Sequence, residues 1–301
     1  MDLKITIGSK KLNSPVCVAS GTFGYGSEYE KLINFHSVGA IFTKAVTFEP
    51  RHGNKPPRIV ETPSGLLNSI GLANVGVKEF LKSKLPFLST LPCAIIPNIA
   101  GSSEYEYCKV LEMLDEREQL FGYEINISCP NVKKGALAFG TDPVCVESLT
   151  KQVRRVTKKP LIIKLSPNVT DISSIAKAAE NGGADAISCI NTIKGMVIDI
   201  ATKKTVLPTG TGGLSGPAIR PIGVAMTYAV KRAVTIPVFG IGGIMNGNDA
   251  LQYLLAGASA IQIGTANFVN PKATERVLNG ILDFVRKEKM TCIQDFHSYI
   301  T

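Results

Sequence analysis

One stretch near the C-terminal end decides the fold: residues 236–266 read IPVFGIGGIMNGNDALQYLLAGASAIQIGTA. Its two ends, 236–240 and 260–263, are short apolar runs of the kind found in strands buried on both faces of a parallel sheet. Between them, residues 248–256 have a helical pattern. A strand, a helix and another strand in this order predict one unit of a parallel α/β fold.

The same alternation extends over the rest of the chain. Further strands are expected at 16–19, 40–45, 94–99, 123–127, 161–165 and 186–190. The other helical patterns are at 27–34, 77–85, 104–118, 143–157, 171–181, 217–233 and 271–287. Eight alternations predict a (β/α)8 TIM barrel. Because such barrels routinely exceed 200 residues, we expect residues 1–301 to form a single domain.

The segments outside the repeat also have a predicted place. Residues 3–7 and 11–13, on either side of Gly8 and Ser9, predict an N-terminal β-hairpin that caps the bottom of the barrel. Two long inserted loops, 46–78 and 191–216, follow the second and sixth strands. They are expected on the C-terminal face, where the active sites of such barrels lie.

Composition narrows the class of protein. The chain is 45% hydrophobic and 19% charged, and no apolar stretch reaches the length of about 18 residues typical of a membrane span. With no signal-peptide pattern, the expected location is cytoplasmic, away from membranes. The net charge of +9 is spread along the chain, which favours a solvated basic surface and anionic ligands over nucleic-acid binding.

Metal and disulfide chemistry are not indicated. The three histidines have no metal-ligand spacing, and no CxxC pair occurs, so no metal site is expected. The seven cysteines are 17, 93, 108, 129, 145, 189 and 292. Their odd number and wide scatter do not suggest a disulfide framework. Most lie in apolar runs, whereas Cys129 lies in a polar one.

The glycines after the last two predicted strands indicate a phosphate site. Gly242 and Gly243 follow the seventh strand, and Gly264 and Thr265 follow the eighth. Glycines let backbone N–H groups approach a phosphate closely, and these two loops form the common phosphate site of such barrels. The alternative is that the glycines only make tight turns. The pattern indicates a phosphate and does not by itself specify a flavin.

Two lysines end core strands, Lys44 on the second and Lys164 on the fifth. A lysine at the mouth of a barrel is costly unless an anion meets it. Three roles stay open from the residues alone: a Schiff-base lysine of a non-redox phosphate-binding barrel, a cation beside a reduced flavin or a substrate carboxylate, and a structural ion pair.

Amides and one thiol gather at the same predicted face. Four asparagines lie at or beyond strand ends and would suit a planar polar ring: Asn68, Asn98, Asn126 and Asn191. Cys129 follows the fourth strand, where a thiolate is a candidate base, although a free cysteine has a pKa of about 8.5. Residues 130–140 are a candidate lid. In isolation, Cys129 could equally be an inert turn residue.

The chain resembles the soluble (class 1) dihydroorotate dehydrogenases, and most closely the class 1B catalytic subunit. The resemblance covers essentially the whole chain. The stretches that carry it are 19–26 (ASGTFGYG), 43–47 (TKAVT), 50–54 (PRHGN), 67–72 (LNSIGL), 126–131 (NISCPN), 164–168 (KLSPN), 190–192 (INT), 212–216 (GGLSG), 240–243 (GIGG) and 263–265 (IGT).

The resemblance implies oxidation of dihydroorotate to orotate in pyrimidine biosynthesis, with one FMN per chain. It implies that Cys129 removes the C5 proton while a hydride passes from C6 to FMN. The implied substrate-binding residues are Lys44, Asn68, Ser69, Ile70, Gly71, Leu72, Asn126, Asn191 and Thr192. The implied cofactor-binding residues are Ser20, Lys44, Ala45, Asn98, Asn126, Lys164, Ile190, Gly216, Gly242, Gly243, Gly264 and Thr265.

The resemblance also implies a partner. Class 1B enzymes reach NAD through an electron-transfer subunit that carries FAD and a 2Fe-2S cluster, in a heterotetramer of two catalytic and two electron-transfer subunits. The alternatives are a fumarate-reducing homodimer of class 1A and a related enzyme that reduces free pyrimidines.

Overall fold

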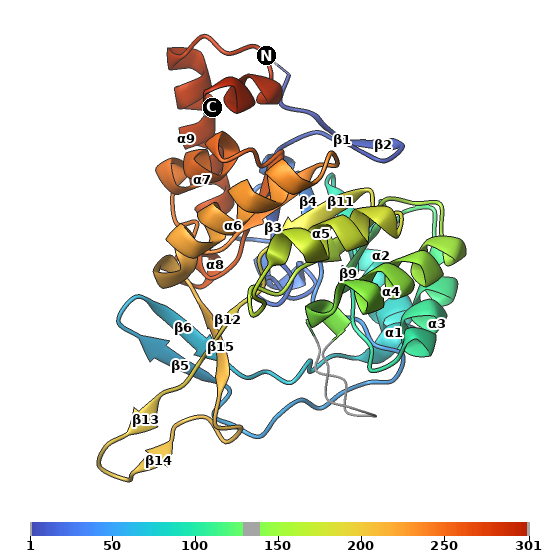
Figure 1. Ribbon diagram of the computed structural model, residues 1–301, viewed down its shortest axis with the longest axis vertical. Coiled ribbons are helices and arrows are strands. Elements are labelled where there is room, and N and C mark those ends of the chain that lie inside the picture. The colour runs from blue at the N-terminus through green and yellow to red at the C-terminus, as the bar shows by residue number, and fades with distance from the viewer. Residues whose placement is uncertain (1, 129–138, 300–301) are drawn as a thin grey trace.

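The computed structural model describes residues 2–128 and 139–299. In this part of the chain, the central sheet has nine parallel strand segments in the order β7-β4-β3-β17-β16-β11-β10-β9-β8 (Figure 1). Their bounds are β3 Val16–Val18, β4 Ala40–Phe42, β7 Ala94–Ile96, β8 Asn98–Ile99, β9 Tyr123–Asn126, β10 Leu161–Lys164, β11 Ala186–Cys189, β16 Val238–Ile241 and β17 Ala260–Ile263.

The two ends of this order belong to one extended segment. β7 and β8 lie on either side of Pro97, which has no N–H to give to a ladder. The Pro97 carbonyl still accepts a hydrogen bond from the Glu124 amide at 3.0 Å. The sheet is therefore closed on itself through eight successive strands, and the predicted TIM barrel is confirmed.

Helices follow the strands and begin at polar caps. The side chains of Ser103, Asp142, Asp171 and Asn246 each accept a hydrogen bond from a backbone N–H in the first turn of the helix that follows. The main helices are α3 Glu104–Asp115, α4 Pro143–Val156, α5 Ile172–Asn181, α6 Arg220–Ala233, α7 Gly247–Leu255 and α9 Ala273–Lys287, with the short α8 Ala266–Val269 before α9.

The first predicted helix, over 27–34, is wrong. The structure has two separate 3-10 turns instead, η1 Ser27–Tyr29 and η2 Phe35–Ser37. The Asn34 side chain accepts a hydrogen bond from the His36 amide at 3.0 Å, which starts a new turn where a helix would have continued. Phe23 also stacks on Tyr29, with 3.9 Å between ring centroids, and holds the segment against the core.

The predicted helix over 77–85 is present but interrupted. It comprises α1 Gly76–Glu79, a wider π-helical turn η3 Phe80–Lys84, and α2 Leu85–Leu88. Pro86 lies in the first turn of α2, where its missing N–H removes one bond of a regular helix. A wider turn just before the proline accommodates that loss.

The N-terminal hairpin is present as expected. β1 Ile5–Ile7 pairs antiparallel with β2 Lys10–Leu12, and Gly8 in the turn has a φ of 54°. Buried side chains of both strands join the hydrophobic cluster that includes Val16 and Ala260, the first residues of β3 and β17. The hairpin therefore closes the amino-terminal end of the barrel.

The two long loops pair with each other. They form a four-stranded antiparallel sheet in the order β12-β15-β6-β5, from which the small hairpin of β13 and β14 projects (Figure 1). The bounds are β5 Ile59–Thr62, β6 Gly65–Asn68, β12 Ile193–Gly195, β13 Ile198–Asp199, β14 Lys204–Thr205 and β15 Gly212–Ser215. Over residues 2–128 and 139–299, no helix combines the length and hydropathy of a membrane span.

Candidate active site

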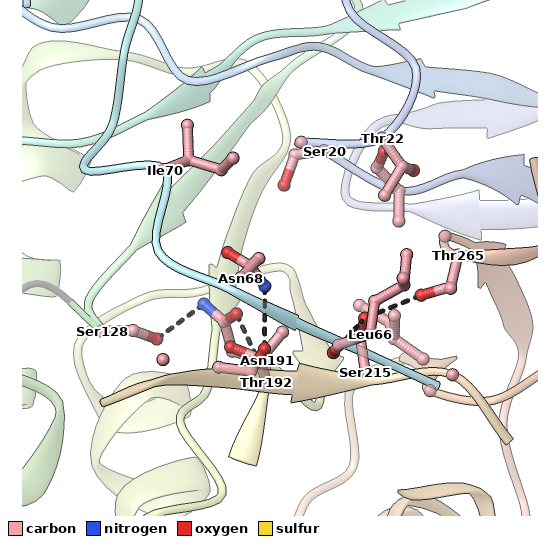
Figure 2. Close-up of a pocket in the computed structure, with 18 of the residues that line it drawn as sticks. Ser20, Thr22, Leu66, Asn68, Ile70, Ser128, Asn191, Thr192, Ser215 and Thr265 are labelled. Carbon is pink, nitrogen blue, oxygen red and sulfur yellow. Dashed lines mark hydrogen bonds between the residues drawn. The ribbon is translucent and has the colours of Figure 1, made fainter. Parts of the chain in front are cut away.

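A cavity of about 790 Å³ lies between the carboxyl ends of the barrel strands and the four-stranded sheet. Figure 2 shows its polar residues facing one another from both sides. Every described residue that the sequence placed in the site lines it: Ser20, Lys44, Ala45, Asn68, Ser69, Ile70, Gly71, Leu72, Asn98, Asn126, Lys164, Ile190, Asn191, Thr192, Gly216, Gly242, Gly243, Gly264 and Thr265.

The predicted base, Cys129, lies outside the described residues, as does most of the candidate lid at 130–140. The described chain before it reaches the site: β9 ends at Asn126, and Ser128 lines the cavity.

The charged side chains that line the described part of the cavity are all positive. Four cationic side chains line it, Lys44, Arg51, Lys164 and Lys194, and none of its described lining residues is aspartate or glutamate. Cations in a partly enclosed cavity attract an anion strongly because little water screens them. The site is therefore suited to a ligand that carries phosphate or carboxylate groups.

Lys164 is the most deeply buried of these cations. Its side chain is 6% exposed, and its ammonium lies 3.8 Å from a carboxylate oxygen of Glu124 and 3.1 Å from the hydroxyl of Ser20. The structural ion pair that the sequence left open is thus present, at a lysine that also faces the cavity.

One wall of the cavity is built of amides. The Asn191 side-chain NH₂ donates to the Ser128 hydroxyl at 2.9 Å and to the Asn126 side-chain oxygen at 3.3 Å. Its own oxygen accepts a hydrogen bond from the Thr192 amide at 2.8 Å. Asn68 reaches the same region from β6, where its NH₂ donates to the Gly213 carbonyl at 2.9 Å (Figure 2). These bonds fix the amides in place, as recognition of a polar ring requires.

The loops after β16 and β17 form a glycine-lined wall. Gly242 and Gly243 have φ values of 127° and 65°, which side-chain-bearing residues rarely adopt. A Cβ atom at Gly264 would have no neighbour closer than 3.7 Å, so a side chain there would occupy the cavity. Thr265 lies beside them, 2.8 Å from Ser215 between the two hydroxyl oxygens (Figure 2).

Several lining residues had no assigned role from the sequence. Arg51 lies 3.6 Å from Glu106, and the Asn54 side chain donates to the carbonyl and hydroxyl oxygens of Ser69 at 3.1 and 2.8 Å. Both fall in the quoted stretch 50–54, which was the available signal. Asn168 falls in another quoted stretch, 164–168, directly after β10, whereas Lys194 on β12 lies outside every quoted stretch and had no comparable signal.

Two cysteines in the barrel strands are inert by burial. Cys17 and Cys189 have no exposed surface. Desolvation disfavours the thiolate, and this burial raises the pKa of Cys189 to about 12 and that of Cys17 further. We expect neither to react with iodoacetamide in the native protein at pH 8, and both to react after unfolding, as measured by peptide mass spectrometry. An adduct on either cysteine in the folded protein would contradict the buried arrangement.

Comparisons with known proteins agree with this geometry. Residues 2–285 match the family model described as dihydroorotate dehydrogenase. The "Dihydroorotate dehydrogenase B (NAD(+)), catalytic subunit" of Geotalea daltonii is 49% identical over 98% of this chain and 96% of its own length. The protein with the same description from Thermoanaerobacter sp. (strain X514) is 51% identical over 95% of this chain and 94% of its own length.

A solved structure shows the same fold at lower identity. The dihydroorotate dehydrogenase of Eimeria tenella, crystallised with ferulenol, superposes with a TM-score of 0.80 at 21% identity, over 98% of this chain and 87% of that one. A structure of low sequence identity thus has the same fold. The bacterial relatives are about half identical in sequence along nearly their full length. This chain belongs to the dihydroorotate dehydrogenase family.

Proposed function

We propose that this chain is the FMN-dependent catalytic subunit of an NAD-linked dihydroorotate dehydrogenase, which oxidises dihydroorotate to orotate in pyrimidine biosynthesis. The observation that carries the proposal is the cavity, where four cations, no described carboxylate and a wall of fixed amides meet in one place. Dihydroorotate has a carboxylate and a ring of alternating C=O and N–H groups, and FMN has a phosphate. Both ligands match that chemistry.

The cavity suits FMN on its glycine side. Gly264 leaves room where a side chain would otherwise enter the cavity, and Gly242 and Gly243 allow positive-φ backbone turns beside it. All three follow the two strands whose loops commonly hold phosphate. Lys164 and Ser20 would contact the rest of the flavin, with Ala45, Asn98, Ile190, Gly216 and Thr265 around it. When bound, FMN supplies the acceptor for the hydride that leaves C6 of the substrate.

The amide wall would hold the substrate. Asn68, Asn126 and Asn191 present donors and acceptors to the pyrimidine ring, with Thr192 beside them. Lys44 would pair with negative charge on the ligands. The backbone turns at Gly71 and Leu72, whose φ values are 72° and 56°, and residues 69–72 would line the substrate there.

Cys129 would remove the proton from C5. A thiolate is a competent base once its negative charge is stabilised, and the cations that line the cavity would provide that stabilisation. Asn126 and Ser128, which precede Cys129 by three residues and one residue, both line the cavity.

The electrons would leave through a second subunit. The bacterial relatives are described as NAD(+)-linked catalytic subunits, which supports an electron-transfer partner that carries FAD and a 2Fe-2S cluster. We place the complex in the cytoplasm as a heterotetramer of two catalytic and two electron-transfer subunits. The catalytic chain would act as one domain over residues 1–301.

Anaerobic mixing tests the proposal. The purified chain is expected to be yellow, to release one FMN per chain on denaturation, and to lose its flavin absorbance when dihydroorotate is added. NAD should restore the colour only with the partner subunit present, and fumarate should not restore it. A colourless protein, or a flavin that dihydroorotate leaves oxidised, would refute the function. Reoxidation by fumarate alone would refute the NAD-linked assignment.

A further inference from the structure

Beneath the cavity, the barrel interior holds a buried polar cluster: Asn98, Glu124, Lys164, Ser188 and Gln262. Glu124, Ser188 and Gln262 have no exposed surface, and Asn98 and Lys164 are 1% and 5% exposed. The Gln262 NH₂ donates to Glu124 at 3.1 Å and to Ser188 at 2.9 Å. β17, which carries Gln262, is not adjacent to β9 or β11 in the sheet, so these bonds cross the inside of the barrel.

Each oxygen of the Glu124 carboxylate accepts a hydrogen bond from a side-chain amide. One oxygen accepts from the Asn98 NH₂ at 2.5 Å, and the other accepts from Gln262. Its distance of 3.8 Å to the Lys164 ammonium exceeds that of a direct hydrogen bond. Glu124 therefore acts on Lys164 by charge, and leaves ammonium protons of Lys164 free to point toward the cavity that this lysine lines.

This pair is unusual for its burial. Among the ion pairs of the described residues, Lys164–Glu124 is the one in which both side chains are less than a tenth exposed. A buried ion pair is a poor way to gain stability, because desolvation offsets most of the attraction. A buried lysine at a ligand cavity, by contrast, needs a counter-charge if it is to stay protonated when water is excluded.

We propose that Glu124 is a positioning residue that keeps the Lys164 ammonium charged and fixed against the bound flavin, and so raises the midpoint potential of FMN. The inference rests on the proposed FMN site. Other charged side chains that line the same cavity are Lys44, Arg51 and Lys194, all cations that oppose a charged Lys164. Glu124 is the described carboxylate in contact with it.

The test compares three variants by anaerobic potentiometry and by affinity for sulfite, which adds to oxidised flavin more tightly when a cation is near. Glu124→Gln keeps the shape and removes the charge. Without a counter-ion, Lys164 would lose its proton or turn away, and the flavin would lose its cation. We expect sulfite binding to weaken at least tenfold. We expect the potential to fall by at least about 30 mV, which is a tenfold change in a two-electron equilibrium.

Two further variants separate the charge effect from damage to the cluster. In the double variant Glu124→Gln, Lys164→Met, the FMN midpoint potential should equal that in Glu124→Gln alone. The reason is that Lys164 has already lost its effect on the flavin in the single variant. Ser188→Ala, which removes a hydroxyl from the same cluster without changing charge, should match the wild type. An FMN midpoint potential in Glu124→Gln that is unchanged or higher than in the wild type overturns the proposal. A potential in the double variant well below that of Glu124→Gln alone also overturns it.

Loss of fold in Glu124→Gln would not end the test. Glu124→Asp keeps the negative charge but moves it farther from Lys164. The FMN midpoint potential should therefore fall by less than in Glu124→Gln. A potential equal to that of the wild type overturns the proposal. Failure of the wild-type chain to bind FMN would instead refute the proposed function, which distinguishes the two.

Discussion

Replacement of Cys129 by serine is expected to slow reduction of the flavin by dihydroorotate at neutral pH by about 10²- to 10⁴-fold, the usual contribution of a positioned general base. The hydroxyl of serine holds its proton far more tightly than a thiol, so little of the basic form exists near pH 7. The loss should shrink as pH rises. Stopped-flow absorbance of the flavin under anaerobic conditions measures the rate directly.

Cys145→Ser is the matched control. It makes the same chemical change at a partly buried thiol on α4, outside the residues that line the cavity. Its flavin should be reduced at the wild-type rate. If Cys129→Ser also reacted at that rate at pH 7, Cys129 would not be the base, whereas equal slowing in both variants would indicate general damage.

Gly264→Val should strongly weaken FMN binding while the barrel still folds. Gly264 does not have a positive φ, and the atom nearest to its missing Cβ lies 3.7 Å away, which is ordinary van der Waals contact. The valine side chain would therefore fit the fold but fill the glycine-lined wall. We expect FMN affinity to drop at least 100-fold, about 2.7 kcal/mol. Fluorescence titration of the apoprotein with FMN measures the loss.

Gly264→Ala supplies a graded comparison, since a single methyl group takes less of the same space and should weaken FMN less than valine does. Thermal unfolding of both apoproteins, followed by circular dichroism, should give Tm values close to that of the wild-type apoprotein. Wild-type FMN affinity in the valine variant would show that the phosphate is held elsewhere. A large fall in Tm would show that the glycine serves the fold.

The strands of the barrel could be predicted because each one is buried on both faces and is therefore apolar for nearly its whole length. β17 matches its predicted range, and β10 and β11 differ from theirs by one residue at one end. The helix expected over 27–34 failed because a local hydrogen bond from His36 to Asn34 competes with helical bonding. Such side-chain competition does not change hydrophobic periodicity.

The sequence by itself determined the repeating architecture and the end of the barrel at which ligands gather. Both follow from local patterns: apolar runs, and glycines, lysines and amides at strand ends. Tertiary structure alone decided how the two long loops pair, since the Asn68–Gly213 contact joins residues 145 apart in sequence. It also placed Glu124 opposite Gln262 across the barrel, 138 residues away. The sequence around a glutamate in an apolar strand does not indicate its partners, because closure of the barrel determines which strands lie opposite each other.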